Sequence, residues 1–276
     1  MLAFTKMQSL GNDFILVDGI RLPFELDKGQ IRYIADRHLG IGCDQVLVAE
    51  LTDSNADFAM RVFNADGTEA EQCGNGARCF ARFLHEEGLS DKRRLSVALR
   101  RHAINLEVED DWQVVVEMGE PIFDPSEIPF ESDHQTAAYE LEVSNEVYEV
   151  HVVSMGNPHA VVLVNDIDSV DVDSLGAAIG RHARFPQGAN VGFVSLNTRN
   201  KLRLRVWERG VGETLACGSG ACAAVVSCHR VGEVDDQVLV ELPGGVLDVR
   251  WPGQGSVFLK GSAITVFRGE INLALV

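Results

Sequence analysis

The chain contains the same cysteine motif twice, and this internal repeat constrains the fold more than any other feature of the sequence. Residues 63–77 match residues 207–221 at a constant offset of 144 (217 − 73 = 144). Each copy holds the pattern Cys-Gly-(Asn/Ser)-Gly-Ala, which begins at Cys73 and at Cys217, and a glutamate stands four residues before each cysteine. Self-similarity at a fixed spacing is the signature of a duplicated structural unit.

Two shorter matches follow the same order along the chain. Gly11-Asn12 corresponds to Gly156-Asn157, and Gln45-Val46 corresponds to Asn190-Val191, both at an offset of 145. Three matches in one order and at nearly one spacing are hard to produce by chance. We therefore expect the chain to fold as two copies of one design.

Each half is predicted to combine strands with one helix that begins at the cysteine motif. Apolar residues are patterned as in strands over 58–63 and alternate over 202–206. After each motif, apolar side chains recur at the helical spacing i, i+3, i+4 and i+7, from Ala77 before Gly88 and from Ala221 before Gly232. Residues 124–129 contain two prolines and are interpreted as a linker between the halves.

Composition excludes several classes of function. The chain has 24 Lys and Arg residues and 41 Asp and Glu residues, which gives a formal net charge of −17. Such a surface repels phosphate backbones and anionic lipid headgroups, so we expect neither nucleic acid nor a membrane as partner. No apolar run approaches the roughly 20 residues of a membrane span, and the first residues lack the pattern of a signal peptide. The expected location is the cytoplasm.

The six cysteines are expected to be reduced thiols. They are too few for a disulfide scaffold. No Cys-x-x-Cys pair and no zinc-ligand spacing occurs among them, so no metal site is expected. Cys79, Cys222 and Cys228 are interpreted as small buried hydrophobic residues.

Cys73 and Cys217 are different because each precedes the first turn of a predicted helix. The free N–H groups and the dipole of that turn favour a thiolate, so the pKa of each thiol is predicted to fall below its usual value of about 8.5. The following glycines let N–H groups approach a bound carboxylate. If the two halves face each other, one thiolate can remove a proton from an α-carbon while the opposed thiol delivers one to the other face. That chemistry inverts an α-carbon without a cofactor, and none of the five lysines lies in a phosphate-binding motif typical of pyridoxal phosphate sites.

The motifs together resemble those of the diaminopimelate epimerase family. The segments that carry the resemblance span the chain: 11–14, 42–45, 64–67, 73–79, 156–159, 190–191, 208–210 and 217–220. The resemblance implies an α+β fold of two pseudo-symmetric domains, each a mixed, mainly antiparallel, β-barrel-like sheet around a central helix. The halves would be 1–118 and 119–263, with a C-terminal strand in 264–276 packing back on the first. It also implies cofactor-independent interconversion of LL- and meso-diaminopimelate, on the route to lysine and peptidoglycan precursors.

The resemblance further implies roles for individual residues. Cys73 and Cys217 would be the catalytic pair, and His159 and Glu208 would keep the thiols in their working protonation states. The residues that would bind substrate are Asn12, Gln45, Asn64, Gly74, Asn75, Asn157, Asn190, Glu208, Arg209, Gly218 and Ser219. A homodimer is expected through the C-terminal segment, where Phe267 stands at a position at which the family often has Tyr.

Two other interpretations remain open from the sequence. One is a racemase of the same architecture that acts on proline or hydroxyproline, although a monocarboxylate would leave the asparagines and Arg209 without a second carboxylate to bind. The other is a thiol redox or metal-binding protein that uses Cys73 and Cys217. Exchange of the substrate α-hydrogen with solvent would separate an epimerase from the second alternative.

Overall fold

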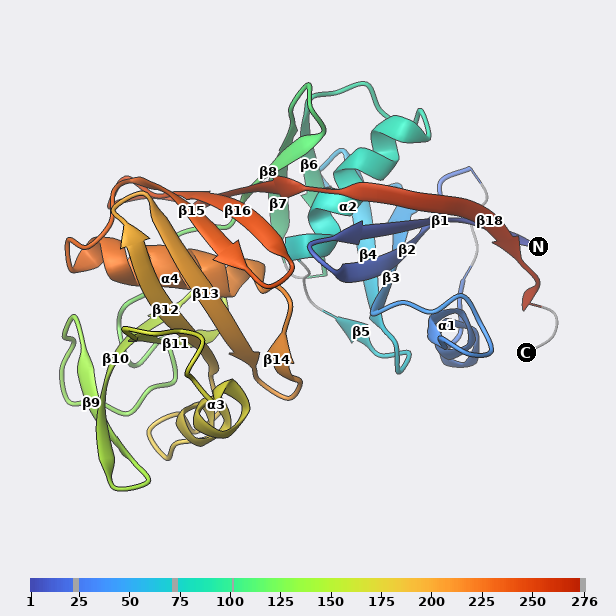
Figure 1. Ribbon diagram of the computed structural model, residues 1–276. Coiled ribbons are helices and arrows are strands. Elements are labelled where there is room, and N and C mark those ends of the chain that lie inside the picture. Colours follow the sequence, from blue (N-terminus) through green and yellow to red (C-terminus); the bar gives the residue numbers. More distant parts are fainter. Residues whose placement is uncertain (22–24, 71–73, 101, 274–276) are drawn as a thin grey trace. The chain divides into compact units, whose positions relative to one another are not determined.

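The computed structural model describes residues 1–21, 25–70, 74–100 and 102–273 (Figure 1). Contacts divide the chain into two compact units. Unit 1 comprises Met1–Val116 together with Gly261–Val276, and unit 2 comprises Glu117–Lys260. Unit 1 is therefore built from two pieces of chain that are far apart in the sequence.

Unit 1 consists of strands and two helices. Its elements are β1 (Leu2–Ser9), β2 (Asn12–Asp18), α1 (Lys28–Ala35), β3 (Gln45–Glu50), β4 (Phe58–Asn64), β5 (Glu69–Ala70), α2 (Gly74–Glu86), β6 (Arg94–Ala98), β7 (Ala103–Val108), β8 (Gln113–Glu117), which ends at the first residue of unit 2, and β18 (Ile264–Ile271).

The sheet of unit 1 is mixed but mainly antiparallel. The strand β1 pairs antiparallel with both β2 and β18, whereas β2 and β3 are parallel. The helix α2 contacts β1, β2, β3 and β7 (Figure 1). Its buried apolar residues include Phe80 and Leu84. It ends at Glu86, and Gly88, two residues further on, has a φ of 63°, which suits a glycine that follows a helix.

Unit 2 repeats this plan. Its elements are β9 (Tyr139–Val143), β10 (Glu146–Ser154), β11 (Pro158–Leu163), α3 (Val172–Gly180), β12 (Asn190–Thr198), β13 (Lys201–Glu208), β14 (Gly212–Thr214), α4 (Gly218–Arg230), β15 (Gln237–Leu242), β16 (Gly245–Arg250) and β17 (Phe258–Ser262), whose last two residues belong to unit 1.

The register of the sheet shows the repeat directly. In unit 1 the parallel pair β2–β3 places Phe14 opposite Gln45, and in unit 2 the parallel pair β11–β12 places His159 opposite Asn190. Both residues of the second pair lie 145 positions after those of the first. The helix α4 contacts β10–β13, β15 and β16, as α2 contacts the strands of its own unit. The expected α+β fold of mixed, mainly antiparallel sheets with few helices is confirmed.

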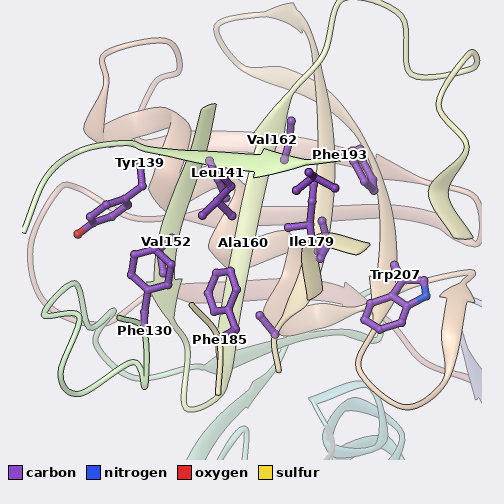
Figure 2. Packing of buried hydrophobic residues seen from close by; sticks show 14 of the residues in the cluster. Phe130, Tyr139, Leu141, Val152, Ala160, Val162, Ile179, Phe185, Phe193 and Trp207 are labelled. Atoms are coloured by element: carbon purple, nitrogen blue, oxygen red, sulfur yellow. The ribbon is translucent and has the colours of Figure 1, made fainter. Parts of the chain in front are cut away.

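A cluster of buried apolar residues in unit 2 lies between its sheet and α3 (Figure 2). Phe130, Phe185 and Trp207 are buried there. Gly176 and Gly180 lie one turn apart on α3, and a Cβ at either would come within 2.5 Å of a Trp207 atom. The two glycines therefore let α3 rest on the indole that immediately precedes Glu208 in β13.

Residues 124–129, expected to link the halves, lie inside unit 2 because this unit begins at Glu117. Ile128 of this segment is buried in the core of the unit. No helix within the described ranges has both the length and the apolar character needed to cross a membrane.

Candidate active site

Three predicted residues of unit 1 meet at one edge of its sheet. Asn12 begins β2, Gln45 begins β3 and Asn64 ends β4. Because β2 and β3 are parallel and β4 runs antiparallel to β3, these three ends lie at the same edge. Gln45 lies opposite Asn64 and its Nε2 donates to Asn64 Oδ1 over 2.9 Å. The amides are thus held in defined orientations.

The start of α2 comes close to the same edge. The helix begins at Gly74, and Asn75 is buried with its Nδ2 3.5 Å from Asn12 Oδ1. Arg78 fixes this orientation because its Nη2 donates to Asn75 Oδ1 over 2.8 Å, and it also donates to Ser9 Oγ. Cys73, the residue before Gly74, lies outside the described residues.

Arg78 is a residue that our sequence reasoning missed. Its side chain is fully buried, which is rare for arginine. A signal was present, since Arg78 lies between the apolar residues Ala77 and Cys79 at the start of the predicted helix. The pattern predicted a helix but gave no means of telling a buried arginine from one that reaches solvent.

A network of charged residues holds the side chain of Asn12 in place. Asn12 Nδ2 donates to Asp44, and Arg37 bridges Asp44 and Asp13. Lys6 Nζ lies 2.6 Å from Asp13 Oδ2. Burial opposes ionisation of Asp13, but hydrogen bonds and charge from Arg37 and Lys6 outweigh it and hold its pKa well below the usual range. Asp13 therefore remains a carboxylate that anchors this edge.

In unit 2, Cys217 caps the N-terminus of α4. Its Sγ accepts from Gly220 N over 3.3 Å and lies 3.6 Å from Ser219 Oγ. The side chain is buried, with 6% exposed. The predicted position of the thiol at the mouth of a helix is confirmed.

The predicted direction of the pKa of Cys217 is wrong. Burial, together with the nearby charge of Glu208, raises the pKa of the thiol to about 12. The hydrogen bonds from Ser219 and Gly220 lower it, but by less than the loss of hydration raises it. In this state Cys217 is a protonated thiol, which suits it to donate a proton.

Glu208 is the carboxylate next to this thiol. It ends β13, and Thr214 Oγ1 of the neighbouring strand β14 donates to Glu208 Oε1 over 2.5 Å. Burial raises its pKa, while hydrogen bonds from Thr214 and Cys217 oppose the rise. Glu208 and Cys217 therefore form a hydrogen-bonded pair in which burial disfavours the charge on both groups.

The remaining predicted residues of unit 2 gather around the start of β11. His159 is buried and its Nε2 lies 3.0 Å from Asn157 Oδ1, an acceptor, so this nitrogen carries the proton. Burial, with the charge of Arg209, lowers the pKa of His159 to about 3. Asn190 Oδ1 accepts from Arg209 N over 2.9 Å and its Nδ2 donates to Pro158 O.

Arg209 is exposed and lies against a turn. Its Nη1 donates to Gln187 O over 2.7 Å and to Gly188 O over 3.3 Å. Gly188 has φ of 70°, and a Cβ there would lie 3.1 Å from Arg209 Cδ, so glycine suits both the turn and the contact. The turn thus holds the guanidinium, while the backbone N–H of Arg209 is held by Asn190. An exposed guanidinium of this kind is chemically suited to clamp a carboxylate.

The structure thus assembles the predicted residues into groups within each unit. Unit 1 brings together Asn12, Gln45, Asn64 and Asn75. In unit 2, Asn157, His159, Asn190 and Arg209 form one group, and Glu208, Cys217 and Ser219 form another. Among the residues that the structure describes, no three His, Cys, Asp or Glu side chains are placed to hold a metal ion.

The duplicated α+β fold defines a class of two-unit proteins. It is similar to a PhzF-family phenazine biosynthesis protein from Bacillus anthracis, with a TM-score of 0.71, 16% identity and 99% of each chain covered. It is also similar to a probable proline racemase from Agrobacterium radiobacter, with a TM-score of 0.70, 14% identity and 99% and 93% of the two chains covered.

The sequence defines the family within this class. The family model described as diaminopimelate epimerase matches residues 4–123 and 151–266. Proteins named diaminopimelate epimerase are 52% identical in Aromatoleum aromaticum over 274 residues, with 99% of each chain covered, and 50% identical in Thioalkalivibrio sulfidiphilus over 274 residues, with 98% and 99% covered. The chain belongs to the diaminopimelate epimerase family and is an isomerase. The proline racemase and redox or metal-binding interpretations are set aside.

Proposed function

We propose that the protein interconverts LL- and meso-2,6-diaminopimelate, with Cys73 and Cys217 as the acid and base of the proton transfers. The observation that carries the proposal is Cys217 at the start of α4, hydrogen-bonded to Glu208, in a chain of this family. The reaction supplies precursors of lysine and peptidoglycan in the cytoplasm.

The reaction removes one proton from the α-carbon and adds another proton to the opposite face of the same carbon. A thiolate takes the α-proton, the electron pair of the C–H bond is delocalised into the adjacent carboxylate, and the second thiol protonates the opposite face. N–H groups of Gly74, Asn75, Gly218 and Ser219 stabilise the charge on that carboxylate. The sulfur that gave a proton ends as thiolate and the other as thiol.

Cys217 enters the reaction as the acid in one direction because burial keeps its proton in place. For the reverse direction it must first lose this proton. Glu208 is the acceptor, because its own pKa is raised by burial and the two side chains are hydrogen-bonded. His159 stays neutral in this scheme and orients Asn157.

The far end of the substrate decides which molecule is accepted. Arg209 with Asn64, Asn157 and Asn190 holds the distal carboxylate, and Glu208 holds the distal ammonium. Asn12 and Gln45 complete the contacts from unit 1. Three points of attachment define the handedness of the distal centre, so only one end of the substrate is inverted.

Solvent exchange at the α-carbon tests this proposal. LL-diaminopimelate is incubated with reduced protein in D₂O, and deuterium at the α-carbon is followed by NMR together with chiral separation of the isomers. Cys73→Ala and Cys217→Ala are each expected to abolish epimerisation, because inversion needs a group on both faces. Cys228→Ala, a buried thiol at the other end of α4, serves as the control. Near-normal epimerisation by either of the first two variants would show the two-thiol mechanism to be wrong.

A homodimer through β18 is part of the proposal. Phe267 is 47% exposed and packs edge-on against Phe4, with ring centroids 5.8 Å apart. Val266 and Ile264 on the same strand are also exposed. Phe267→Glu should convert the protein to a monomer in light scattering, and a wild-type protein that is itself monomeric would contradict the expectation.

A further inference from the structure

The glutamates that stand four residues before each cysteine are not used by the chemistry described so far. In the structure each forms an ion pair with an arginine of the preceding strand, Glu69 with Arg61 and Glu213 with Arg205. The two arginines are separated by the same offset as the two glutamates (205 − 61 = 144 and 213 − 69 = 144). The repeat therefore preserves a pair of residues rather than a single one.

The strands that carry the pairs have the same register in both units. Phe63 lies opposite Glu69 in the β4–β5 hairpin, and Trp207 lies opposite Glu213 in the β13–β14 hairpin. Each pair thus joins the two strands of a hairpin diagonally. The second strand of each hairpin leads, within a few residues, to a cysteine.

In unit 2 the pair is strongly built. Arg205 Nε lies 2.7 Å from Glu213 Oε1 and Arg205 Nη2 lies 2.9 Å from Oε2, which is a bidentate geometry. Arg205 Nη1 donates to Ile167 O and Val170 O, both over 3.0 Å. Glu213 N donates to Asp173 Oδ1 in the first turn of α3. The hairpin is thereby fastened to α3 and to the loop that precedes it.

The opposite face of this hairpin carries the candidate chemistry. Side chains alternate along a strand, so Glu213 and Thr214 point to opposite faces. Thr214 holds Glu208, which is hydrogen-bonded to Cys217. The same face packs on the first turn of α4, because a Cβ on Gly220 would lie 3.2 Å from Val206 Cγ2. Only three residues separate Glu213, which is held by Arg205, from Cys217.

In unit 1 the pair is looser. Arg61 Nε lies 3.1 Å from Glu69 Oε1, and Arg61 Nη1 lies 3.5 Å from Glu50 Oε1 instead. The side chain of Arg61 is 36% exposed, against 24% for that of Arg205. Water and the second carboxylate compete for this arginine, so its hold on the hairpin is weaker.

We propose that the two Arg–Glu pairs are positioning residues of the reaction, and that Arg205–Glu213 is the dominant one. The pair touches no substrate. It holds β14 so that Thr214 keeps Glu208 against Cys217 and the thiol stays in line with the α-carbon. The inference rests on the proposed roles of Glu208 and Cys217.

The variant Glu213→Gln tests the proposal, since it removes the charge and keeps the size. A displacement of the thiol by about 1 Å is expected to lower kcat by roughly 10- to 100-fold. KM should change less than kcat, because Arg209 is held by Asn190 of β12 and, among the distal contacts, only Glu208 depends on the Arg205–Glu213 pair. Glu69→Gln should lower kcat by a smaller factor.

The control is another bidentate pair on the same strand. Arg203 Nη1 and Nη2 lie 2.9 and 2.7 Å from the carboxylate of Asp168, and this pair does not join the hairpin. Asp168→Asn is expected to leave kcat unchanged. Alkylation of Cys217 by iodoacetamide, mapped by mass spectrometry, should change in rate in Glu213→Gln and not in Asp168→Asn.

The outcomes separate the positioning role from other roles. Arg205→Met combined with Glu213→Gln should lose no more activity than the more damaging single variant, because the two residues act as one unit. Equal kcat in Glu213→Gln and Asp168→Asn, or a lower kcat with unchanged alkylation of Cys217, would overturn the inference. If Glu213→Gln does not fold, Arg205→Lys, which keeps the charge and loses the fork, gives the same comparison. Full activity of Cys217→Ala would instead refute the proposed function.

Discussion

The buried His159 makes the stability of the protein depend on pH in a way that can be calculated. Burial and the charge of Arg209 lower its pKa to about 3, from an ordinary value of 6.5. Between these two values the unfolded chain binds a proton that the folded chain does not bind. The contribution of His159 to the free energy of unfolding is therefore fully present above pH 6.5 and is lost as the pH falls toward 3.

The size of the effect follows from the two pKa values. Each pH unit below the unfolded pKa costs about 1.4 kcal/mol. At pH 5 the loss is about 2 kcal/mol, set by the 1.5 units between pH 5 and the unfolded pKa. This figure holds for any folded pKa well below 5, since only the unfolded chain is then protonated. At pH 7.5 the loss of stability from this titration is close to zero.

The substitution His159→Gln removes the titration and keeps an N–H donor for Asn157. We expect the wild type to lose about 2 kcal/mol more stability than this variant between pH 7.5 and pH 5.0. Urea unfolding followed by circular dichroism at both pH values measures the difference, with the two units fitted as separate transitions. His102→Gln, at an exposed histidine outside any strand or helix, is the control. If wild type and His159→Gln lose the same stability, the histidine is not held neutral by burial and the reasoning fails.

Three other predictions concern the site and its support. Arg209→Met removes a charge-assisted hydrogen bond worth roughly 1.5–3 kcal/mol and should raise KM for diaminopimelate about 10- to 100-fold; unchanged steady-state kinetics would contradict the clamp. Gly176→Ala places a Cβ 2.5 Å from Trp207 Cβ and should lower the free energy of unfolding by about 1–3 kcal/mol, measured in urea, whereas wild-type stability would show that α3 can move away. Glu208→Gln removes a charge that raises the pKa of Cys217, so the thiol should alkylate at lower pH; an unaltered pH profile would assign the shift to burial alone.

The repeat was sufficient to predict much of the fold. It placed a helix after each cysteine motif, and the structure has α2 and α4 there, ending near Gly88 and Gly232 as the glycines indicated. It also aligned Gln45 with Asn190, which occupy equivalent places in their sheets. These features are local or periodic, and the sequence displays them directly.

The electrostatics of the site depend on what the fold buries, and this the sequence does not display. The start of a helix is visible as a pattern, so Cys217 was located correctly. Its pKa was predicted in the wrong direction because neither the burial of the thiol nor the contact with Glu208 follows from spacing. Arg78 was overlooked for the same reason: an arginine on a helix is usually exposed, and only packing shows that this one is enclosed.

The discontinuity of unit 1 has a consequence for the order in which a newly made chain can fold. Residues of unit 2 leave the ribosome as one uninterrupted stretch, whereas β1 waits for its partner β18 until all of unit 2 has been made. Until then β1 is an open edge with unpaired backbone groups, the kind of surface on which chains associate wrongly. The N-terminal unit is thus the last to close, the reverse of the usual vectorial order. A chain truncated after residue 260 would contain all of unit 2 but would lack β18. Its β1 edge would then be free to pair with a strand of another molecule.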